Sequence, residues 1–190
     1  AGRVPSLLSI QVGRDENSRV YLEAQKRVAE QLGIRYGIRY FESAISAETL
    51  VYNIRKINDD PDIDAVIIQT PLPEHLKYRE MIRLLDPGKD AEGTHPFNLG
   101  CLAVDADVPA PPTARAVMDI LDFIEYDLYG KRVTIVGSSD IVGKPLAMML
   151  LNRMATVSVT HVATSEKGQL PEYVGSADVL VVAVGRSRLI

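Results

Sequence analysis

The chain has 190 residues, of which 46% are hydrophobic and 24% are charged. This composition is typical of a globular protein with one large domain or two small ones, and it excludes a disordered or fibrous chain. With 21 basic and 25 acidic residues, the formal net charge is −4, which argues against a general attraction to nucleic acid.

Short apolar runs alternate with longer segments whose apolar residues recur at helical spacing, which predicts βαβ units built on a parallel sheet. In the first half of the chain, strands are predicted at residues 7–12, 34–41 and 65–69, and helices at residues 18–32, 46–59 and 76–85. Gly33 is expected to end the first helix in the left-handed conformation, and Ser46 to cap the second helix. The apolar stripe of the first helix is predicted to comprise Val20, Ala24, Val28 and Leu32.

Seven prolines lie between Gln69 and Thr113, and they predict a long structured connection that only the helix at residues 76–85 interrupts. Thr113 is expected to cap a helix that ends near residue 124. Further along, strands are predicted at residues 132–136, 156–160 and 179–184, and helices at residues 142–153 and 170–174. The predicted fold class is therefore α/β with two domains, residues 1–112 and residues 113–190.

A glycine-bearing turn separates the strand at residues 132–136 from the helix that follows it. Gly137 is expected to end the strand where a side chain would block a ligand, and Gly143 to let the helix approach the sheet closely. Free backbone amides at the start of this helix can bind a pyrophosphate, which favours a Rossmann-like dinucleotide-binding domain. The spacing Gly137-x5-Gly143 departs from GxGxxG, so a tight turn without any ligand is the alternative.

Six segments, in chain order, carry a resemblance to one enzyme family. The turn sequence GSSDIVGKPLAMMLL resembles the G-R-S-x-x-V-G-x-P signature of the methylenetetrahydrofolate dehydrogenase/cyclohydrolase family. The other segments that resemble motifs of this family are VGRDENSRVYLEAQ, IIQTPLPEHL, DPGKDAEGTHPFNLGCL, PPTARAVMDIL and ADVLVVAVGRSRLI. The resemblance implies two α/β domains that flank a cleft, with folate bound by the first and NAD(P) by the second. Because family members continue with further strands, we expect the second domain to be incomplete at its C-terminus.

The resemblance implies a folate site formed by residues of the first domain. Tyr21 corresponds to the tyrosine that stacks on the folate, Gln69 to the glutamine that hydrogen-bonds the family's lysine, and Glu92 to an aspartate that binds the pterin edge. Plainer interpretations stay open, with Gln69 as a polar residue that ends a strand and Asp90 as a turn-forming aspartate. The residues implied to bind substrate are Ser18, Tyr21, Gln69, Pro71, Leu72, Asp90 and Glu92, and those implied in catalysis are Tyr21, Gln25, Gln69 and Glu92.

Gln25 occupies the position of the family's catalytic lysine, one helical turn after Tyr21. A carboxamide has no titratable proton, so it cannot act as a general acid or base. Lys26 lies about 100° further round the helix and is expected to be a solvated surface lysine. Methenyltetrahydrofolate cyclohydrolase activity, which in the family depends on the lysine, is therefore expected to be impaired or absent, whereas hydride transfer can survive.

The resemblance also implies a nicotinamide dinucleotide site in the second domain. Arginine at two family positions accommodates the 2′-phosphate of NADP, but Ser138 and Ala163 stand there in this chain. NADP is the family default, and NAD stays open because Ser138 replaces one of these arginines. For His161 the alternatives are a cofactor contact and a buried, hydrogen-bonded histidine, of which the second is favoured. The residues implied to bind the cofactor are Gly137, Ser138, Ser139, Ile141, Val142, Gly143, Pro145, His161, Thr164, Val184 and Gly185. No metal site is expected, because the histidines lack ligand spacing.

The implied function is that of a 5,10-methylenetetrahydrofolate dehydrogenase, an oxidoreductase of one-carbon metabolism and purine biosynthesis that transfers a hydride to NAD(P). The alternative is a non-catalytic relative that binds folate or dinucleotide as a regulatory or partner subunit, since Gln25, Ser138 and Glu92 depart from the family pattern. A homodimer is expected through the cofactor domain, with a small-molecule folate as substrate and neither nucleic acid nor membrane as partner. Cys101 is the single cysteine and no apolar run reaches the roughly 18 residues of a membrane span, so we expect a cytoplasmic protein.

Overall fold

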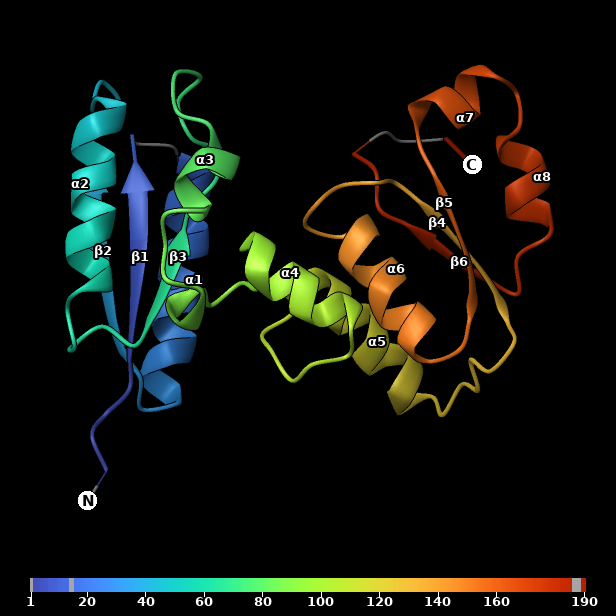
Figure 1. Cartoon of the computed structure of the whole chain (residues 1–190), viewed down its shortest axis with the longest axis horizontal. Coiled ribbons are helices and arrows are strands. Elements are labelled where there is room, and N and C mark those ends of the chain that lie inside the picture. Colours follow the sequence, from blue (N-terminus) through green and yellow to red (C-terminus); the bar gives the residue numbers. More distant parts are fainter. Residues whose placement is uncertain (1, 14–15, 186–188) are drawn as a thin grey trace. The chain divides into compact units, whose positions relative to one another are not determined.

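The structure is a computed structural model that describes residues 2–13, 16–185 and 189–190. The chain divides into two compact units, Ala1–His95 and Pro96–Ile190. Within the described residues, each unit is built on a three-stranded parallel sheet with helices beside it, as Figure 1 shows. None of the helices in these residues is long and apolar enough to cross a membrane. The predicted α/β fold with parallel sheets is confirmed.

The first unit follows a βαβ pattern from its N-terminus. Its strands are β1 (Ser6–Val12), β2 (Arg35–Phe41) and β3 (Ala65–Ile68), and its helices are α1 (Glu16–Gln31), α2 (Ala47–Asn58) and α3 (Tyr78–Ile82), with a 3-10 turn at Pro87–Lys89. The strand order is β2-β1-β3 with both pairings parallel, so that Ser9 of β1 lies opposite Ile38 and Ile67. Two local predictions are confirmed: Gly33 follows α1 with a φ of 70°, and Ser46 caps α2.

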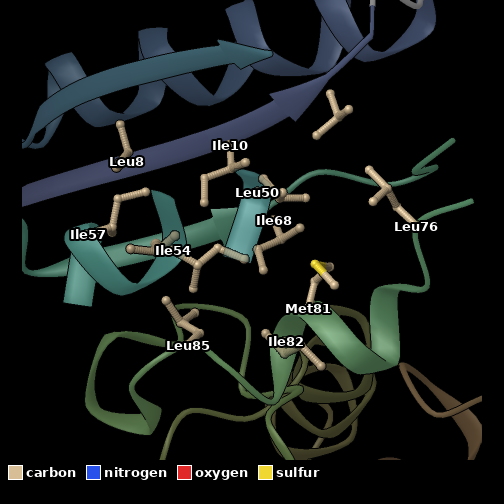
Figure 2. Packing of buried hydrophobic residues seen from close by; sticks show 12 residues of the cluster. Leu8, Ile10, Leu50, Ile54, Ile57, Ile68, Leu76, Met81, Ile82 and Leu85 are labelled. Carbon is tan, nitrogen blue, oxygen red and sulfur yellow. The ribbon is translucent and has the colours of Figure 1, made fainter. Parts of the chain in front are cut away.

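The main hydrophobic core of this unit lies between the sheet and helices α2 and α3 (Figure 2). Successive side chains of a strand point to opposite faces, and Leu8, Ile10 and Val12 of β1 all point into this core. The buried residues that form the core are Leu8, Ile10, Val12, Leu50, Ile54, Ile57, Val66, Ile68, Leu76, Met81, Ile82 and Leu85. The alternate residues Ser9 and Gln11 therefore lie on the opposite face of β1. Ile38 and Ile67 lie beside Ser9 on that face, so it mixes polar and apolar residues.

Helix α1 packs on this mixed face of the sheet, where Gln25 bonds to Tyr36 and Gln69, and its buried side is not the one predicted. Val20, Val28 and Leu32 have exposed fractions of 64%, 50% and 68%. Leu22 and Ala29 are buried instead, with 1% and 4% of their surface exposed. The predicted stripe followed hydrophobic periodicity alone. Because the sheet face below α1 itself mixes polar and apolar residues, the helix covers it with a side of the same mixed character.

The second unit repeats the parallel arrangement, with strand order β5-β4-β6. Its strands are β4 (Arg132–Val136), β5 (Thr156–Thr160) and β6 (Val179–Val182), and its helices are α4 (Pro96–Ala103), α5 (Pro112–Phe123), α6 (Gly143–Asn152), α7 (Val162–Glu166) and α8 (Leu170–Gly175). Helices α4 and α5 pack against α6, which in turn packs on β4 and β5. The core that results comprises Leu102, Ala114, Met118, Leu121, Leu128, Val133, Ile135, Leu146, Met149, Leu150 and Ala155.

Several predicted boundaries are wrong, and proline explains the largest errors. Pro96 begins α4, a helix absent from the predicted proline-rich connection, because the first turn of a helix tolerates proline. For the same reason α5 begins at Pro112, and Thr113 is not its cap. The helix predicted at residues 76–85 is confined to α3. Strand β6 ends two residues earlier than predicted, at Val182, and α7 has no counterpart among the predicted elements.

The compact units divide between His95 and Pro96, ahead of the domain boundary predicted at residue 112. Helix α4 belongs to the second unit because it packs on α6, where the Asn152 side-chain amide donates to the Leu102 carbonyl oxygen at 2.9 Å. A compact unit and a functional domain need not divide at the same residue. The domain extents 1–112 and 113–190 therefore stay predictions.

Candidate functional site

The first unit has a topological switch point between β1 and β3, because the chain continues from β1 to β2 on one side and crosses to β3 on the other. In parallel α/β sheets, ligands bind at such a point, outside the carboxyl ends of the strands. Gln69 directly follows β3 at this edge and is only 5% exposed. Its backbone amide donates to the Ile10 carbonyl oxygen at 2.9 Å, which fixes the residue to the end of β1.

Four side chains on the face of the sheet beneath α1 form a closed ring of hydrogen bonds that ends at this edge with Gln69. We call it the polar ring, and its members are Ser9 of β1, Gln25 of α1, Tyr36 of β2, and Gln69. The Tyr36 hydroxyl lies 2.7 Å from Ser9 Oγ and donates to the Gln25 carboxamide oxygen at 2.9 Å. Gln69 Nε2 donates to the same Gln25 oxygen at 3.0 Å and to Ser9 Oγ at 3.2 Å. Partial burial raises the pKa of Tyr36, so its hydroxyl stays protonated at neutral pH.

The polar ring thus brings together two predicted catalytic residues, Gln25 and Gln69. Lys26, the neighbouring lysine, lies outside the ring. Its ammonium group is solvent-exposed and pairs with Glu30 at 3.8 Å, as expected of a surface lysine. A titratable amine is therefore absent from the position that contacts Gln69.

The remaining residues predicted to bind substrate lie around this edge or close to it in the chain. Tyr21 is on α1, one helical turn before Gln25, and 57% of its surface is exposed. Pro71 follows a cis peptide bond two residues after Gln69, and Leu72 is partly buried against the hydrophobic core. The side chain of Ser18 lies outside what the structure describes.

Asp90 and Glu92 lie on a loop beside β3, and Asp90 fixes the shape of that loop. Asp90 is 3% exposed, and its carboxylate accepts from the Glu92 amide at 3.2 Å and from the His95 amide at 2.7 Å, as expected of a turn-forming aspartate. The pKa of Glu92 is raised to about 7, chiefly by burial and then by the nearby Asp90. Burial also raises the pKa of Tyr78 to about 12, and its hydroxyl lies 2.6 Å from Thr94 Oγ1. Glu92 is therefore able to gain or lose a proton near neutral pH.

In the second unit, backbone atoms crowd both glycines of the turn between β4 and α6. A Cβ atom at Gly143 would lie 1.9 Å from the Gly137 carbonyl oxygen, so the predicted close approach of helix and strand is confirmed. A Cβ atom at Gly137, which has a φ of 123°, would lie 2.4 Å from the Ala183 carbonyl oxygen. A side chain at Gly137 would therefore meet the residue that follows β6, and the predicted close approach of a ligand stays a prediction.

This turn leads into the N-terminus of α6. Ser139 Oγ accepts from the Val142 amide at 3.2 Å, and Lys144 Nζ pairs with Asp140 at 2.6 Å. Ile141 at the tip of the turn is 52% exposed. A compact glycine turn that ends in a helix N-terminus suits the pyrophosphate of a dinucleotide.

His161 directly follows β5 and is exposed, so the prediction of a buried histidine is wrong. Its backbone amide donates to Thr164 Oγ1 at 3.3 Å, directly before α7. Val184 lies after β6, and its Cγ1 atom is 3.2 Å from the position of a Cβ at Gly137. Thr164, Val184 and Gly185 stay predicted cofactor contacts.

Sequence patterns did not identify Ser9 and Tyr36 as site residues, although both belong to the polar ring. A partial signal exists, because Ser9 and Gln11 are polar residues at alternate positions of an otherwise apolar strand. Gln11 is 3% exposed, and within the described residues its side-chain oxygen has no hydrogen-bond partner. No comparable signal marks Tyr36.

Comparison with known proteins identifies one family over both units. Residues 1–92 match the family model described as the catalytic domain of tetrahydrofolate dehydrogenase/cyclohydrolase, and residues 111–190 match the NAD(P)-binding domain of the same family. The chain is 38% identical over 187 residues to the bifunctional protein FolD of a Nitratiruptor species, an alignment that spans 98% of this chain and 65% of that protein. The chain thus covers slightly less than two thirds of this relative.

Solved structures agree with this result. One is the crystal structure of the bifunctional enzyme FolD, a methylenetetrahydrofolate dehydrogenase/cyclohydrolase from Campylobacter jejuni. Its sequence is 34% identical to this chain, and the two structures match with a TM-score of 0.90 over 97% of this chain and 67% of the FolD chain. The Trypanosoma brucei N5,N10-methylenetetrahydrofolate dehydrogenase-cyclohydrolase, complexed with NADP and an inhibitor, is 31% identical with a TM-score of 0.91 over 100% of this chain and 64% of its own. The chain therefore belongs to the tetrahydrofolate dehydrogenase/cyclohydrolase family.

Proposed function

We propose that this protein is a 5,10-methylenetetrahydrofolate dehydrogenase that transfers a hydride to a nicotinamide dinucleotide, with impaired methenyltetrahydrofolate cyclohydrolase activity. The observation that carries the proposal is the 3.0 Å hydrogen bond from Gln69 to Gln25. This contact pairs the glutamine implied by the family resemblance with the position at which the family has its lysine. The non-catalytic alternative is not favoured, because the related proteins bear the names of enzymes.

Hydride transfer depends on orientation more than on proton transfer. When bound, the nicotinamide ring supplies the hydride-accepting chemistry. The residues of the first unit have the task of binding the folate and holding its one-carbon bridge in place. Tyr21 offers an exposed aromatic ring for stacking, and the polar ring offers neutral hydrogen-bonding groups at the switch point. Neither contribution requires an ionisable group.

Hydrolysis of the methenyl product, in contrast, requires proton transfer to and from water. Gln25 and Gln69 do not titrate, and burial keeps Tyr36 protonated at neutral pH. Glu92, with a pKa of about 7, does titrate, but in the described part of the chain no hydrogen bond links its carboxylate to the polar ring. The chain therefore keeps neutral groups that can bind the folate, and at position 25 it lacks the amine that the family uses for hydrolysis.

The cofactor would be held at the turn between β4 and α6. The close contact between Gly137 and Gly143 shapes this turn, and Ser139 organises the first amides of the helix. Ser138 carries no positive charge for a 2′-phosphate, so we propose that discrimination in favour of NADP over NAD is weak.

We infer three further properties from the family resemblance alone. The protein acts as a homodimer that associates through the cofactor domain. It acts in the cytoplasm, and it serves the part of one-carbon metabolism that supplies purine biosynthesis. None of them depends on the polar ring.

The test is a spectrophotometric assay of the complete protein with 5,10-methylenetetrahydrofolate and each of NAD and NADP. Formation of reduced cofactor above background with at least one dinucleotide is expected. Its absence with both would refute the dehydrogenase proposal. Hydrolysis of methenyltetrahydrofolate is followed separately, and hydrolysis as fast as dehydrogenation would refute the proposed impairment.

A further inference from the structure

The hydrogens of the polar ring can be assigned, because each of its members has a fixed set of donors and acceptors. The Gln25 oxygen only accepts, so Tyr36 donates its single hydroxyl hydrogen to that oxygen. The Tyr36 oxygen then accepts from the Ser9 hydroxyl at 2.7 Å. Gln69 Nε2 uses both of its hydrogens, one for Gln25 and one for Ser9. Every hydrogen inside the ring is therefore committed.

The assignment leaves two groups of opposite character outside the ring. Gln25 Nε2, a donor, and Gln69 Oε1, an acceptor, have no hydrogen-bond partner in the described part of the chain. Neither carboxamide can turn over alone, because two donors or two acceptors would then face each other. Tyr36 and Ser9 thus couple the two orientations. The Tyr36 hydroxyl and Gln69 Nε2 both donate to the Gln25 oxygen, and this leaves the Gln25 nitrogen as the neutral donor that position 25 presents.

We propose that Tyr36 is a positioning residue that directs the Gln25 amide nitrogen toward the folate. The nitrogen then donates a hydrogen bond to an acceptor atom of the ligand, and neither group gains or loses a proton. The acceptor is a carbonyl oxygen or a ring nitrogen, the two kinds that a reduced pterin carries. This inference rests on the proposed folate-binding function. It adds a residue that the sequence does not reveal, and a donor whose strength is independent of pH.

Tyr36→Phe tests the coupling, with Tyr40→Phe as the matched control. Tyr40 lies on the same face of β2, is 59% exposed, and its hydroxyl makes no hydrogen bond in the described residues. Tetrahydrofolate binding is measured by anaerobic calorimetry, and KM and kcat are measured with 5,10-methylenetetrahydrofolate. Tyr36→Phe is expected to weaken binding and raise KM about fivefold with little change in kcat, whereas Tyr40→Phe changes neither. Equal behaviour of the two variants overturns the proposal.

Gln25→Glu tests the direction in which the hydrogen bonds run round the polar ring. A carboxylate accepts from Tyr36 and Gln69 but has no hydrogen to donate to the ligand. Tetrahydrofolate affinity is expected to fall about tenfold at alkaline pH and to recover when the introduced carboxyl group is protonated. If the ring ran in the opposite sense, position 25 would present an acceptor, and this variant would bind as tightly as the original protein at every pH. That result overturns the proposal.

The double variant Gln25→Glu with Tyr36→Phe gives a readout that a purely structural role would not move. The Tyr36 hydroxyl stabilises the ionised form of the introduced carboxyl group, so its removal is expected to shift the midpoint of the pH dependence upward by about one unit. An unchanged midpoint contradicts the proposal. Ser9→Ala serves as a second variant, because it removes the hydrogen bond to the Tyr36 hydroxyl and leaves the tyrosine side chain itself unchanged. It is expected to weaken binding about as much as Tyr36→Phe.

The original protein separates failure of this inference from failure of the proposed function. If it binds no tetrahydrofolate and reduces no dinucleotide, the proposed function fails. If it does both, and Tyr36→Phe equals Tyr40→Phe, only the positioning role fails. Urea unfolding of each variant confirms that the comparison is made between folded proteins.

Discussion

The Gly137 carbonyl oxygen lies 1.9 Å from the position that a Cβ atom at Gly143 would occupy, so the first residue of α6 rests directly on the end of β4. The obstructing atom belongs to the backbone, and no side-chain rotation can relieve the contact. The turn that leads into α6 therefore has a shape that only glycine at residue 143 permits.

Gly143→Ala is expected to destabilise the protein by about 3 kcal/mol, because the turn must open to admit the methyl group. Dinucleotide binding should weaken together with stability. Urea unfolding measures the free energy, and quenching of tyrosine fluorescence by NADPH measures the affinity. Gly175→Ala is the control, since a Cβ atom there would meet nothing within 4 Å, and its effect on stability should be small. Similar losses of stability in both variants would show that the turn can accommodate a methyl group at residue 143.

Glu92 is expected to make the folded protein less stable as the pH rises toward neutrality. Its pKa in the folded state, about 7, lies above the ordinary value of 4.5, so the folded state binds this proton more tightly than the unfolded state does. The contribution to stability is complete below pH 4.5 and is lost as the pH rises through about 7.

Glu92→Gln keeps the group neutral and should remove this loss, which amounts to at most about 3 kcal/mol. The free energy of unfolding is measured in urea at about pH 4 and about pH 8. The variant should match the original protein at the lower pH and exceed its stability at the higher pH. Parallel pH profiles for the two proteins would mean that Glu92 is ionised at no cost in the folded state.

The parallel α/β fold could be predicted because its signals are local. Strands buried on both faces form short apolar runs. The helices between them are bounded by residues typical of helix ends, such as Gly33 after α1 and Ser46 before α2. Proline misled the prediction at α4, since the same residue that breaks a helix interior also suits a first turn, as at Pro96. Sequence alone does not say which role a proline plays.

The polar ring could not be predicted, because it depends on strand register. Tyr36 comes within reach of Ser9 and Gln25 only when β2 pairs with β1 so that Tyr36 lies opposite Leu7. A shift of one residue would turn Tyr36 to the other face of the sheet. The buried side of α1 was missed for a related reason, since it depends on which side of the helix the sheet face covers, and periodicity alone does not reveal that.

Ser138→Arg is expected to shift cofactor selectivity toward NADP. Ser138 directly follows Gly137 in the turn that leads to α6, and it offers no positive charge to a 2′-phosphate. An arginine there should raise the ratio of kcat/KM for NADP to that for NAD about tenfold, the typical effect of one charge-assisted hydrogen bond. Ser138→Ala is the control and should leave the ratio nearly unchanged. An equal gain for both dinucleotides would indicate that residue 138 does not lie beside the ribose.

Gln25→Lys is expected to raise the rate of methenyltetrahydrofolate hydrolysis about a hundredfold, because it restores a titratable amine beside Gln69. The polar ring can accommodate the change: the Tyr36 oxygen accepts from an ammonium group, and Gln69 can turn its oxygen toward it. The loss of methenyl absorbance measures the rate. Lys26→Gln, which removes the exposed amine that pairs with Glu30, should leave hydrolysis unchanged. Rapid hydrolysis by the original protein, or a Gln25→Lys variant no faster than it, would mean that a group outside the polar ring performs the proton transfer.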